Sequence, residues 1–244
     1  MDDRVGLALI HGAELGGWVW DPLLAEVRRP AVAVDLPGRG GEPAARRALG
    51  IDDALGAIAD AVDQAGFGRV AVVAHSFAGV LVPGLAERLG ERMQAAVWLG
   101  ASVPERGSSW VDLLPAGQRH LLRAIYRLRP AGMLSPRKES LRLLCNDLEE
   151  ATAIDVVDRR VPEPPGYLLQ PVEAELPLGV PSHYVRLLQD RTQTGDLRDA
   201  SITRLRDPTL HDLDAGHLPM LSQPAALAAL LERIATPFDR TALA

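Results

Sequence analysis

The chain has 244 residues and a formal net charge of −6, and 47% of its residues are hydrophobic. This composition is typical of a globular protein, and the length suits one or two domains. The acidic balance and the lack of a Lys/Arg-rich run argue against nucleic acid as a partner. Cys145 is the single cysteine, which excludes an internal disulfide and a cysteine-based zinc site.

The N-terminus has none of the features of an export signal. Met1-Asp2-Asp3-Arg4 is acidic where a signal peptide is basic. The apolar run from Val5 to Ile10 is too short for a signal core or a membrane span. We therefore expect a cytoplasmic protein with no membrane partner.

Short apolar runs and an amphipathic segment alternate through the first hundred residues. Because the runs are almost continuously apolar, they predict strands buried on both faces, as in a parallel sheet. Helices are expected from Ile51 to Gly66, on a 3.6-residue apolar period, and from Gly79 to Leu89. The predicted strands are Val5 to Ile10, Ala31 to Val34, Val70 to Ala74 and Ala95 to Leu99.

The alternation breaks after residue 102 and resumes after residue 181. Three helical segments are expected in between, followed by a proline-rich stretch that we interpret as an extended return path. The fold class is therefore α/β, with a mostly parallel sheet flanked by helices. Residues 1–102 and 182–244 form its core, and residues 103–181 form an inserted helical lid. The lid helices are Leu121 to Leu128, Glu139 to Leu144 and Asp147 to Arg159.

The last part of the chain adds two strands and a helix. The segment His183 to Leu188 predicts a strand, and a weaker strand covers either Ile202 to Leu205 or Thr209 to Leu213. A final helix begins near Pro224 and has leucines and an isoleucine on one face.

A serine stands between the third strand and the following helix, in Val73-Ala-His-Ser-Phe-Ala-Gly79. A serine at such a sharp turn is exposed at the carboxyl end of the sheet, which is the arrangement of a nucleophile elbow. Ala74 and Ala78 replace the two glycines of the usual pattern, and Gly79 comes one residue later. We predict that Ser76 is the nucleophile.

A serine hydroxyl needs a base to accept its proton, and histidine has a suitable pKa. His217 lies in a loop after Gly216, directly before the final helix. We favour it over the other histidines, of which His211 is the main rival. We expect His75 to point away from the elbow, because it adjoins Ser76. The remaining candidates are His11, His120 and His183.

A carboxylate that orients the imidazole should lie between the serine and the histidine in chain order. Asp190 directly follows the strand that ends near Leu188, which places it at a carboxyl strand end. We favour it over five alternatives in the same region, namely Asp196, Asp199, Asp207, Asp212 and Asp214.

An acyl-transfer site also needs two backbone N–H groups for the oxyanion. The residue after the nucleophile, Phe77, supplies one. The loop His11-Gly12-Ala13 after the first strand supplies the other, and we predict Ala13 as that donor.

These motifs resemble those of the α/β-hydrolase family, and the resemblance covers nearly the whole chain. Within the family, the chain is similar to small esterases related to plant methylesterases and hydroxynitrile lyases. The resemblance implies a Ser76–His217–Asp190 triad, an Ala13/Phe77 oxyanion hole and an apolar pocket under the lid. The motifs that carry it, beside the elbow, are His11-Gly-Ala, Gly16-Gly-Trp, Val34-Asp-Leu-Pro-Gly, Val103-Pro-Glu, Asn146-Asp147, Tyr184-Val185 to Asp190-Arg191, and Gly216-His217.

Two positions depart from this branch. Hydroxynitrile lyases use a lysine after the catalytic histidine, whereas Leu218 stands here, so cyanohydrin cleavage by that route is not expected. Glu14 follows the oxyanion loop where the branch often has cysteine. Pointing inward it could act as an acid or base or exclude anionic substrates; otherwise it is a solvated loop residue.

We predict a cofactor-independent serine hydrolase that cleaves a small to medium, largely apolar ester or lactone. One alternative is natural-product tailoring on the same scaffold by cyclisation, elimination, or thioester or C–C hydrolysis. Another is a ligand-binding receptor. The expected partner is a small-molecule substrate, and the oligomeric state, including a dimer through the lid, stays open. The candidate pocket residues are Glu14, Trp18, Trp110, Tyr126 and Leu218.

Overall fold

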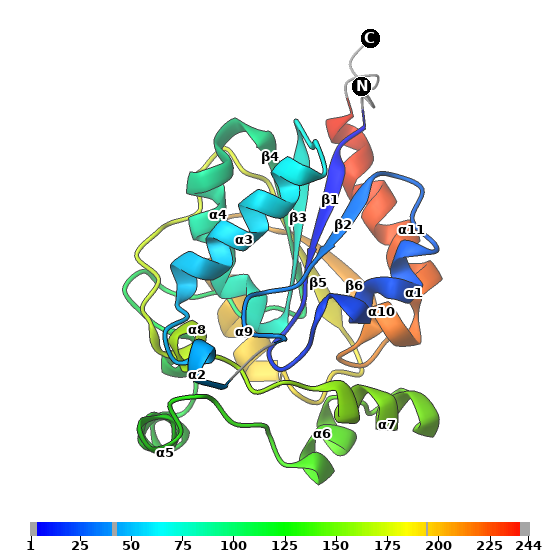
Figure 1. Cartoon of the computed structure of the whole chain (residues 1–244). Coiled ribbons are helices and arrows are strands. Elements are labelled where there is room, and N and C mark those ends of the chain that lie inside the picture. Colours follow the sequence, from blue (N-terminus) through cyan, green and yellow to red (C-terminus); the bar gives the residue numbers. More distant parts are fainter. Residues whose placement is uncertain (1–3, 41–42, 194, 240–244) are drawn as a thin grey trace.

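The computed structural model describes residues 4–40, 43–193 and 195–239, so Met1, Asp2 and Asp3 of the N-terminal segment considered above lie outside the described residues. Six strands form one sheet in the order β2-β1-β3-β4-β5-β6, and every neighbouring pair is parallel (Figure 1). The predicted fold class is confirmed. The strands are β1 (Gly6–Ile10), β2 (Ala31–Val34), β3 (Val70–His75), β4 (Met93–Leu99), β5 (Ser182–Leu187) and β6 (Thr209–Leu213).

The strand order reverses between β1 and β3. Chain connections run outward from β1 to β2 on one side and from β3 through β6 on the other. The carboxyl ends of β1 and β3 therefore mark the topological switch point, which is where open α/β sheets bind ligands. The loop after β1 and the turn after β3 lie close together there.

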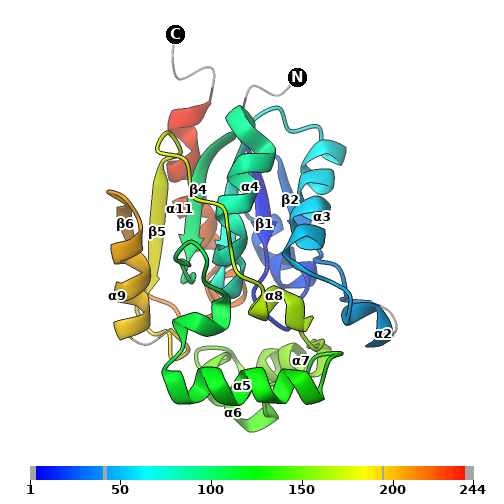
Figure 2. The ribbon, with the colours of Figure 1, turned by 90° about the vertical axis from the view of Figure 1, so that its left-hand side faces the viewer.

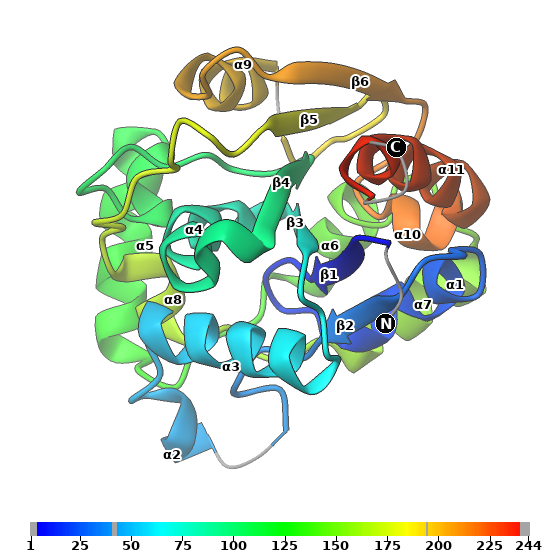
Figure 3. The same cartoon turned by 90° about the horizontal axis from the view of Figure 1, so that it is seen from above.

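Helices cover both faces of the sheet, as the view from above shows (Figure 3). One face packs against α3 (Ile51–Gln64) and α4 (Val82–Leu89), and the other against α1 (Asp21–Leu24) and α11 (Pro224–Ala235). Successive strand residues point to opposite faces, so the continuous apolar runs feed two cores. In β3, for example, Val72 joins the first core and Val73 the second.

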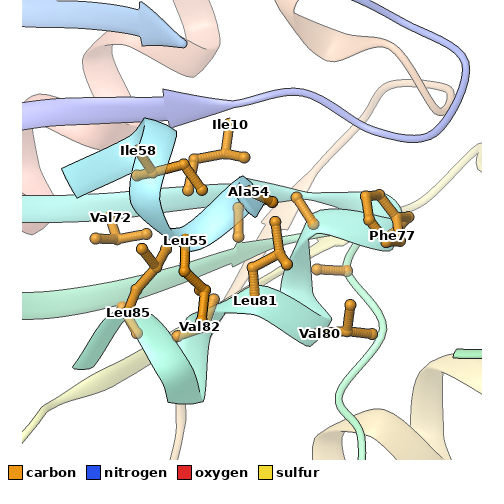
Figure 4. Close-up of a cluster of buried hydrophobic side chains, with 14 of the residues drawn as sticks. Ile10, Ala54, Leu55, Ile58, Val72, Phe77, Val80, Leu81, Val82 and Leu85 are labelled. Atoms are coloured by element: carbon orange, nitrogen blue, oxygen red, sulfur yellow. The ribbon is translucent and has the colours of Figure 1, made fainter. Parts of the chain in front are cut away.

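The core on the α3 and α4 face extends to the end of β3 (Figure 4). Leu55 and Ile58 of α3 pack there with Val82 and Leu85 of α4, all buried. Phe77, directly after the serine, is 1% exposed and anchors the same core. Burial of the Phe77 ring thus anchors the turn that carries Ser76 to this core.

The alternatives for the weak strand are resolved in favour of Thr209 to Leu213. Ile202 to Leu205 instead falls at the end of α9 (Gly195–Arg204). The true strand is weak in sequence because β6 is the sheet edge and its residues are exposed or half-buried. An edge strand needs no continuous apolar run.

The segment from residue 100 to residue 181 connects β4 to β5, and we call it the β4–β5 insertion. It extends across the carboxyl ends of the strands (Figure 2). The proline-rich part contains a short helix, which corrects the expectation of a purely extended path. Proline is tolerated in the first turn of a helix, and Pro165 starts this one. The elements are η4 (Trp110–Leu113), α5 (Ala116–Leu128), α6 (Arg137–Leu143), α7 (Glu150–Arg159) and α8 (Pro165–Leu169).

The remaining elements are short. These elements are η1 (Gly17–Trp20), α2 (Pro43–Arg46), η2 (Ser76–Leu81), η3 (Gly90–Arg92), α10 (Pro219–Ser222) and η5 (Thr236–Phe238).

Among the described residues, no helix is both long and apolar enough to cross a bilayer.

Candidate active site

Ser76 begins η2 directly after β3 and has a φ of 55°, in the left-handed region that non-glycine residues rarely adopt. Such strain persists only where the surroundings impose it. The Ser102 N–H donates to the Ser76 carbonyl at 3.0 Å, and a Cβ on Gly79 would clash with the Ser102 carbonyl oxygen. The close approach therefore requires glycine at position 79, whereas the buried position 78 tolerates alanine.

The three residues predicted as nucleophile, base and orienting acid come together. The Ser76 Oγ lies 2.9 Å from Nε2 of His217, and Nδ1 of His217 lies 2.7 Å from Oδ2 of Asp190. The side chains of His217 and Asp190 are each 3% exposed. The geometry therefore allows proton transfer from Ser76 to an imidazole backed by a carboxylate.

The loop after β5 holds Asp190 in place through Thr192 and Gln193. Oδ1 of Asp190 accepts hydrogen bonds from the Thr192 N–H at 2.7 Å, the Thr192 hydroxyl at 2.8 Å and the Gln193 N–H at 3.2 Å. Burial by itself raises the pKa of Asp190, but the His217 charge and the hydrogen bonds from His217 and Thr192 outweigh it and lower the pKa to about 2. Asp190 is therefore an anion at neutral pH.

Thr192 was not among the predicted site residues, yet its hydroxyl oxygen also lies 2.7 Å from Nδ1 of His217. A signal was present, since an aspartate in a turn commonly accepts a hydrogen bond from the backbone two residues further on, which here is position 192.

His75 packs against the candidate base rather than pointing clear of the site, which corrects our expectation. Its ring centroid is 4.7 Å from that of His217, and its Nε2–H donates to the His217 carbonyl at 2.8 Å. Complete burial, together with the nearby His217 charge, lowers the pKa of His75 to about 3. His75 is thus a neutral donor that fixes the backbone of His217.

The other histidines lie elsewhere. His11 is buried, and its Nδ1 pairs with the Gly12 carbonyl while its Nε2 accepts from the Leu36 N–H. His211 pairs with His183 across β5 and β6, at 3.1 Å between their ring nitrogens. His120 is exposed on α5. None of them replaces His217 at Ser76.

The loop after β1 closes over the serine turn. Gly12 to Leu15 form a turn with a Leu15 N–H to Gly12 carbonyl distance of 3.3 Å. A Cβ on Gly12 would lie 2.9 Å from Nδ1 of His75 and 3.1 Å from the Ser76 Cβ. Ala13 is the next residue, half-buried, while Phe77 lies in the first turn of η2, where backbone N–H groups have no partner within the helix.

A cavity of about 260 Å³ opens beside Ser76 under the β4–β5 insertion. Its apolar wall comes from η4, α6 and α9, and its polar wall from the turns after β3, β4 and β5 and from α9. The apolar residues are Trp110, Leu113, Leu114, Leu143, Leu197 and Ala200. The polar residues are Ser76, Ser102, Thr192, Gln193, Ser201 and Arg204.

Of the five candidate pocket residues, only Trp110 lines this cavity. Leu218 is fully buried in the core on the α11 face, and Tyr126 is 7% exposed in the core on the other face. The Trp18 ring packs against the Arg159 guanidinium, whose Cζ lies 4.0 Å from the ring centroid. The Glu14 carboxylate is held by residues of the insertion, so it is neither a cavity residue nor a solvated one.

Metal ligation is absent from the part of the chain that the structure describes. No group of three or more histidine, cysteine, aspartate or glutamate side chains is placed there to bind a metal ion.

A strained serine turn between a parallel strand and a helix is the nucleophile elbow of hydrolases built on an α/β sheet. A family model described as the alpha/beta hydrolase family matches residues 7–230. The chain belongs to the α/β-hydrolase family.

Several of its curated relatives are named as esterases. A carbendazim-hydrolyzing esterase of Nocardioides sp. (strain SG-4G) is 34% identical over 116 residues, which cover 44% of this chain and 46% of that protein. The match thus spans less than half of that relative. A probable esterase of Oryza sativa subsp. indica is 25% identical over 257 residues, covering 94% of this chain and 96% of the other.

Solved structures share the fold over nearly the whole chain. An extracellular alpha/beta-hydrolase from a Paenibacillus species has a TM-score of 0.83 at 18% identity, covering 94% of this chain and 98% of the other. A methylesterase from Arabidopsis has a TM-score of 0.73 at 20% identity, covering 95% and 99%. The predicted resemblance and the predicted carboxylic ester hydrolase-like enzyme are confirmed.

Proposed function

We propose that this enzyme hydrolyses small to medium, largely apolar carboxylic esters or lactones through an acyl-enzyme on Ser76. The observation that carries the proposal is the hydrogen-bonded chain from Ser76 through His217 to Asp190 at the wall of a cavity that has one apolar side. A serine becomes a nucleophile when a base lies within hydrogen-bond reach and a third group orients that base.

In the first half of the reaction, His217 Nε2 accepts the Ser76 proton as Oγ attacks the ester carbonyl carbon. The Ala13 and Phe77 N–H groups stabilise the tetrahedral oxyanion. His217 then donates the proton to the alkoxide, and the C–O bond breaks to release the alcohol. Asp190 stabilises the imidazolium and holds Nδ1 protonated.

In the second half, water enters the vacated position, and His217 accepts one of its protons as it attacks the acyl carbon. Collapse of the second tetrahedral intermediate breaks the bond to Oγ, which regains its proton from His217. The carboxylic acid leaves, and the cycle uses no cofactor.

The cavity supports a small, mainly apolar substrate. A volume of about 260 Å³ is slightly below the range of roughly 300–1,000 Å³ that is usual for ligand pockets, and half of the lining side chains are apolar. The esterases and methylesterase among the relatives act on esters by name, which agrees with this substrate class.

The β4–β5 insertion supplies Trp110 and Leu143 to the cavity wall. We propose that residues 103–181 act as a lid that excludes water and selects the substrate. Enclosed sites strengthen every electrostatic interaction within them.

Labelling with a fluorophosphonate tests the nucleophile directly. Wild-type protein should be labelled at Ser76, whereas Ser76→Ala should not be labelled. Ser102→Ala is the matched control, because Ser102 lines the same cavity but its hydroxyl accepts a hydrogen bond from the Gln193 side chain, and this variant should label like wild type. Labelling that persists in Ser76→Ala would exclude this nucleophile, and no labelling of wild type would favour a ligand-binding role.

A further inference from the structure

Glu14 adopts a backbone conformation that a glutamate normally avoids. Its φ is 64°, and it occupies the third position of the turn from Gly12 to Leu15. A positive φ at this position of a turn favours glycine or asparagine. Something outside the turn must therefore hold Glu14 there.

The side chain of Glu14 is held by the β4–β5 insertion. Its Oε1 accepts hydrogen bonds from the Ser135 N–H and the Ser135 hydroxyl, each at 2.7 Å. Its Oε2 accepts one from the Arg160 guanidinium at 2.7 Å. The ion pair is largely buried, with side-chain exposures of 13% for Glu14 and 3% for Arg160.

The backbone of Glu14 is held by the same insertion. Its N–H donates to Oε2 of Glu163 at 2.6 Å, and its carbonyl accepts from the Val161 N–H at 2.9 Å. Glu163 is buried and receives two hydrogen bonds of 2.8 Å from the Arg39 guanidinium, which fixes its carboxylate. Both polar groups of the Glu14 backbone and both oxygens of its side chain thus have partners.

The turn that Glu14 completes carries the candidate oxyanion donor. Ala13 precedes Glu14, and the turn starts at Gly12, where an added Cβ would lie 2.9 Å from Nδ1 of His75 and 3.1 Å from the Ser76 Cβ. The direction of the Ala13 N–H therefore depends on the conformation that Glu14 keeps. Oxyanion stabilisation is sensitive to this direction, because the donors must be preorganised.

We propose that Glu14 is a positioning residue, whose contacts with Ser135 and Arg160 hold the turn in the conformation that directs the Ala13 N–H at the oxyanion. The insertion thereby completes the oxyanion hole in addition to covering the cavity. This inference rests on the proposed ester hydrolysis at Ser76.

Replacements of Glu14 by alanine and by glycine separate positioning from simple stabilisation. Alanine loses the contacts and disfavours a positive φ, whereas glycine loses the same contacts but adopts a positive φ readily. We expect Glu14→Ala to lower kcat for p-nitrophenyl butyrate about 10- to 100-fold, with KM changed less than about threefold, because only the transition state loses a donor. We expect Glu14→Gly to recover kcat to within about fivefold of wild type.

Arg137→Gln is the matched control. It removes an ion pair between Arg137 and Asp158 that joins two helices of the insertion, is exposed and does not touch the turn. Its kcat and KM should equal those of wild type. Melting temperatures of all variants show whether each one is folded.

If Glu14→Ala does not fold, Ser135→Ala provides the second test, since it removes one hydrogen bond to the carboxylate. It should lower kcat about threefold, and Glu14→Gly added to it should restore kcat. Wild-type kcat in Glu14→Ala or in Ser135→Ala, or equal losses in Glu14→Ala and Glu14→Gly, would overturn the positioning role alone. Ester hydrolysis that survives Ser76→Ala would instead overturn the proposed function.

Discussion

The Thr192 hydroxyl oxygen lies 2.7 Å from Nδ1 of His217 and 2.8 Å from Oδ1 of Asp190. Because an ionised carboxylate only accepts, the Thr192 proton is donated to Asp190, and the hydroxyl can only accept from His217. Nδ1 of His217 therefore carries its proton, shared between Asp190 and Thr192. This leaves Nε2 as the acceptor that faces Ser76.

Thr192→Val should lower kcat about 3- to 10-fold, because it removes one hydrogen-bond acceptor for the Nδ1–H of His217 and one hydrogen-bond donor to Asp190. KM for p-nitrophenyl butyrate should stay within about twofold. Thr192→Ser keeps the hydroxyl and should behave like wild type. Steady-state kinetics of both variants check this. A kcat of Thr192→Val equal to that of wild type would exclude a role of the Thr192 hydroxyl in positioning His217.

The buried, neutral His75 predicts a pH dependence of stability. Its folded pKa of about 3 lies below the ordinary value of 6.5, so between these values the unfolded chain binds a proton that the folded protein does not. Stability is therefore lost as pH falls below about 6.5, by about 3 kcal/mol at pH 4.5. His75→Gln, which keeps a donor for the His217 carbonyl, should lose about that much less between pH 7 and pH 4.5. Urea unfolding at the two pH values measures the free energy of unfolding of both proteins. Equal losses of stability in wild type and in His75→Gln would contradict the prediction.

Gly79→Ala should destabilise the fold by about 2–4 kcal/mol, because its Cβ would meet the Ser102 carbonyl in the backbone. Gly56→Ala is the matched control. A Cβ on Gly56, inside α3, would meet only the end of the Arg88 side chain at 3.8 Å, so this variant should gain up to about 1 kcal/mol. Thermal unfolding compares the two, and a stable Gly79→Ala would refute the close approach.

The cavity wall predicts how acyl length can be changed. Leu197→Phe in α9 should lower kcat/KM for p-nitrophenyl octanoate about tenfold, because the larger side chain fills part of the cavity. The value of kcat/KM for p-nitrophenyl acetate should change less than about twofold. Leu121→Phe on α5 is the control, since Leu121 is 60% exposed and does not line the cavity. An unchanged length preference in Leu197→Phe would mean that the acyl chain lies elsewhere.

Most of the sheet and the three residues of the candidate hydrogen-bonded chain could be predicted from the sequence. Buried parallel strands are continuous apolar runs, and Ser76, His217 and Asp190 each stand at a strand end or loop that the alternation of strands and helices locates. The edge strand Thr209–Leu213 was ambiguous because exposure on both faces removes the apolar signal.

The pocket could not be predicted in the same way. Side chains of the insertion face either the cavity or the core, and local pattern alone cannot tell these surroundings apart, as Trp110 and Tyr126 show. The partners of Glu14 lie 121 and 146 residues away in the chain, so no local sequence pattern predicts them. A single charged residue in a loop is therefore interpreted as solvated unless its distant partners are known.

Turnover of p-nitrophenyl esters of graded acyl length, by wild type beside Ser76→Ala and His217→Ala, tests the central claim most directly. We predict that wild type hydrolyses short and medium esters and that each variant loses at least about 10³-fold in kcat while remaining folded. Hydrolysis that continues in Ser76→Ala at the wild-type rate would contradict an acyl-enzyme on this serine.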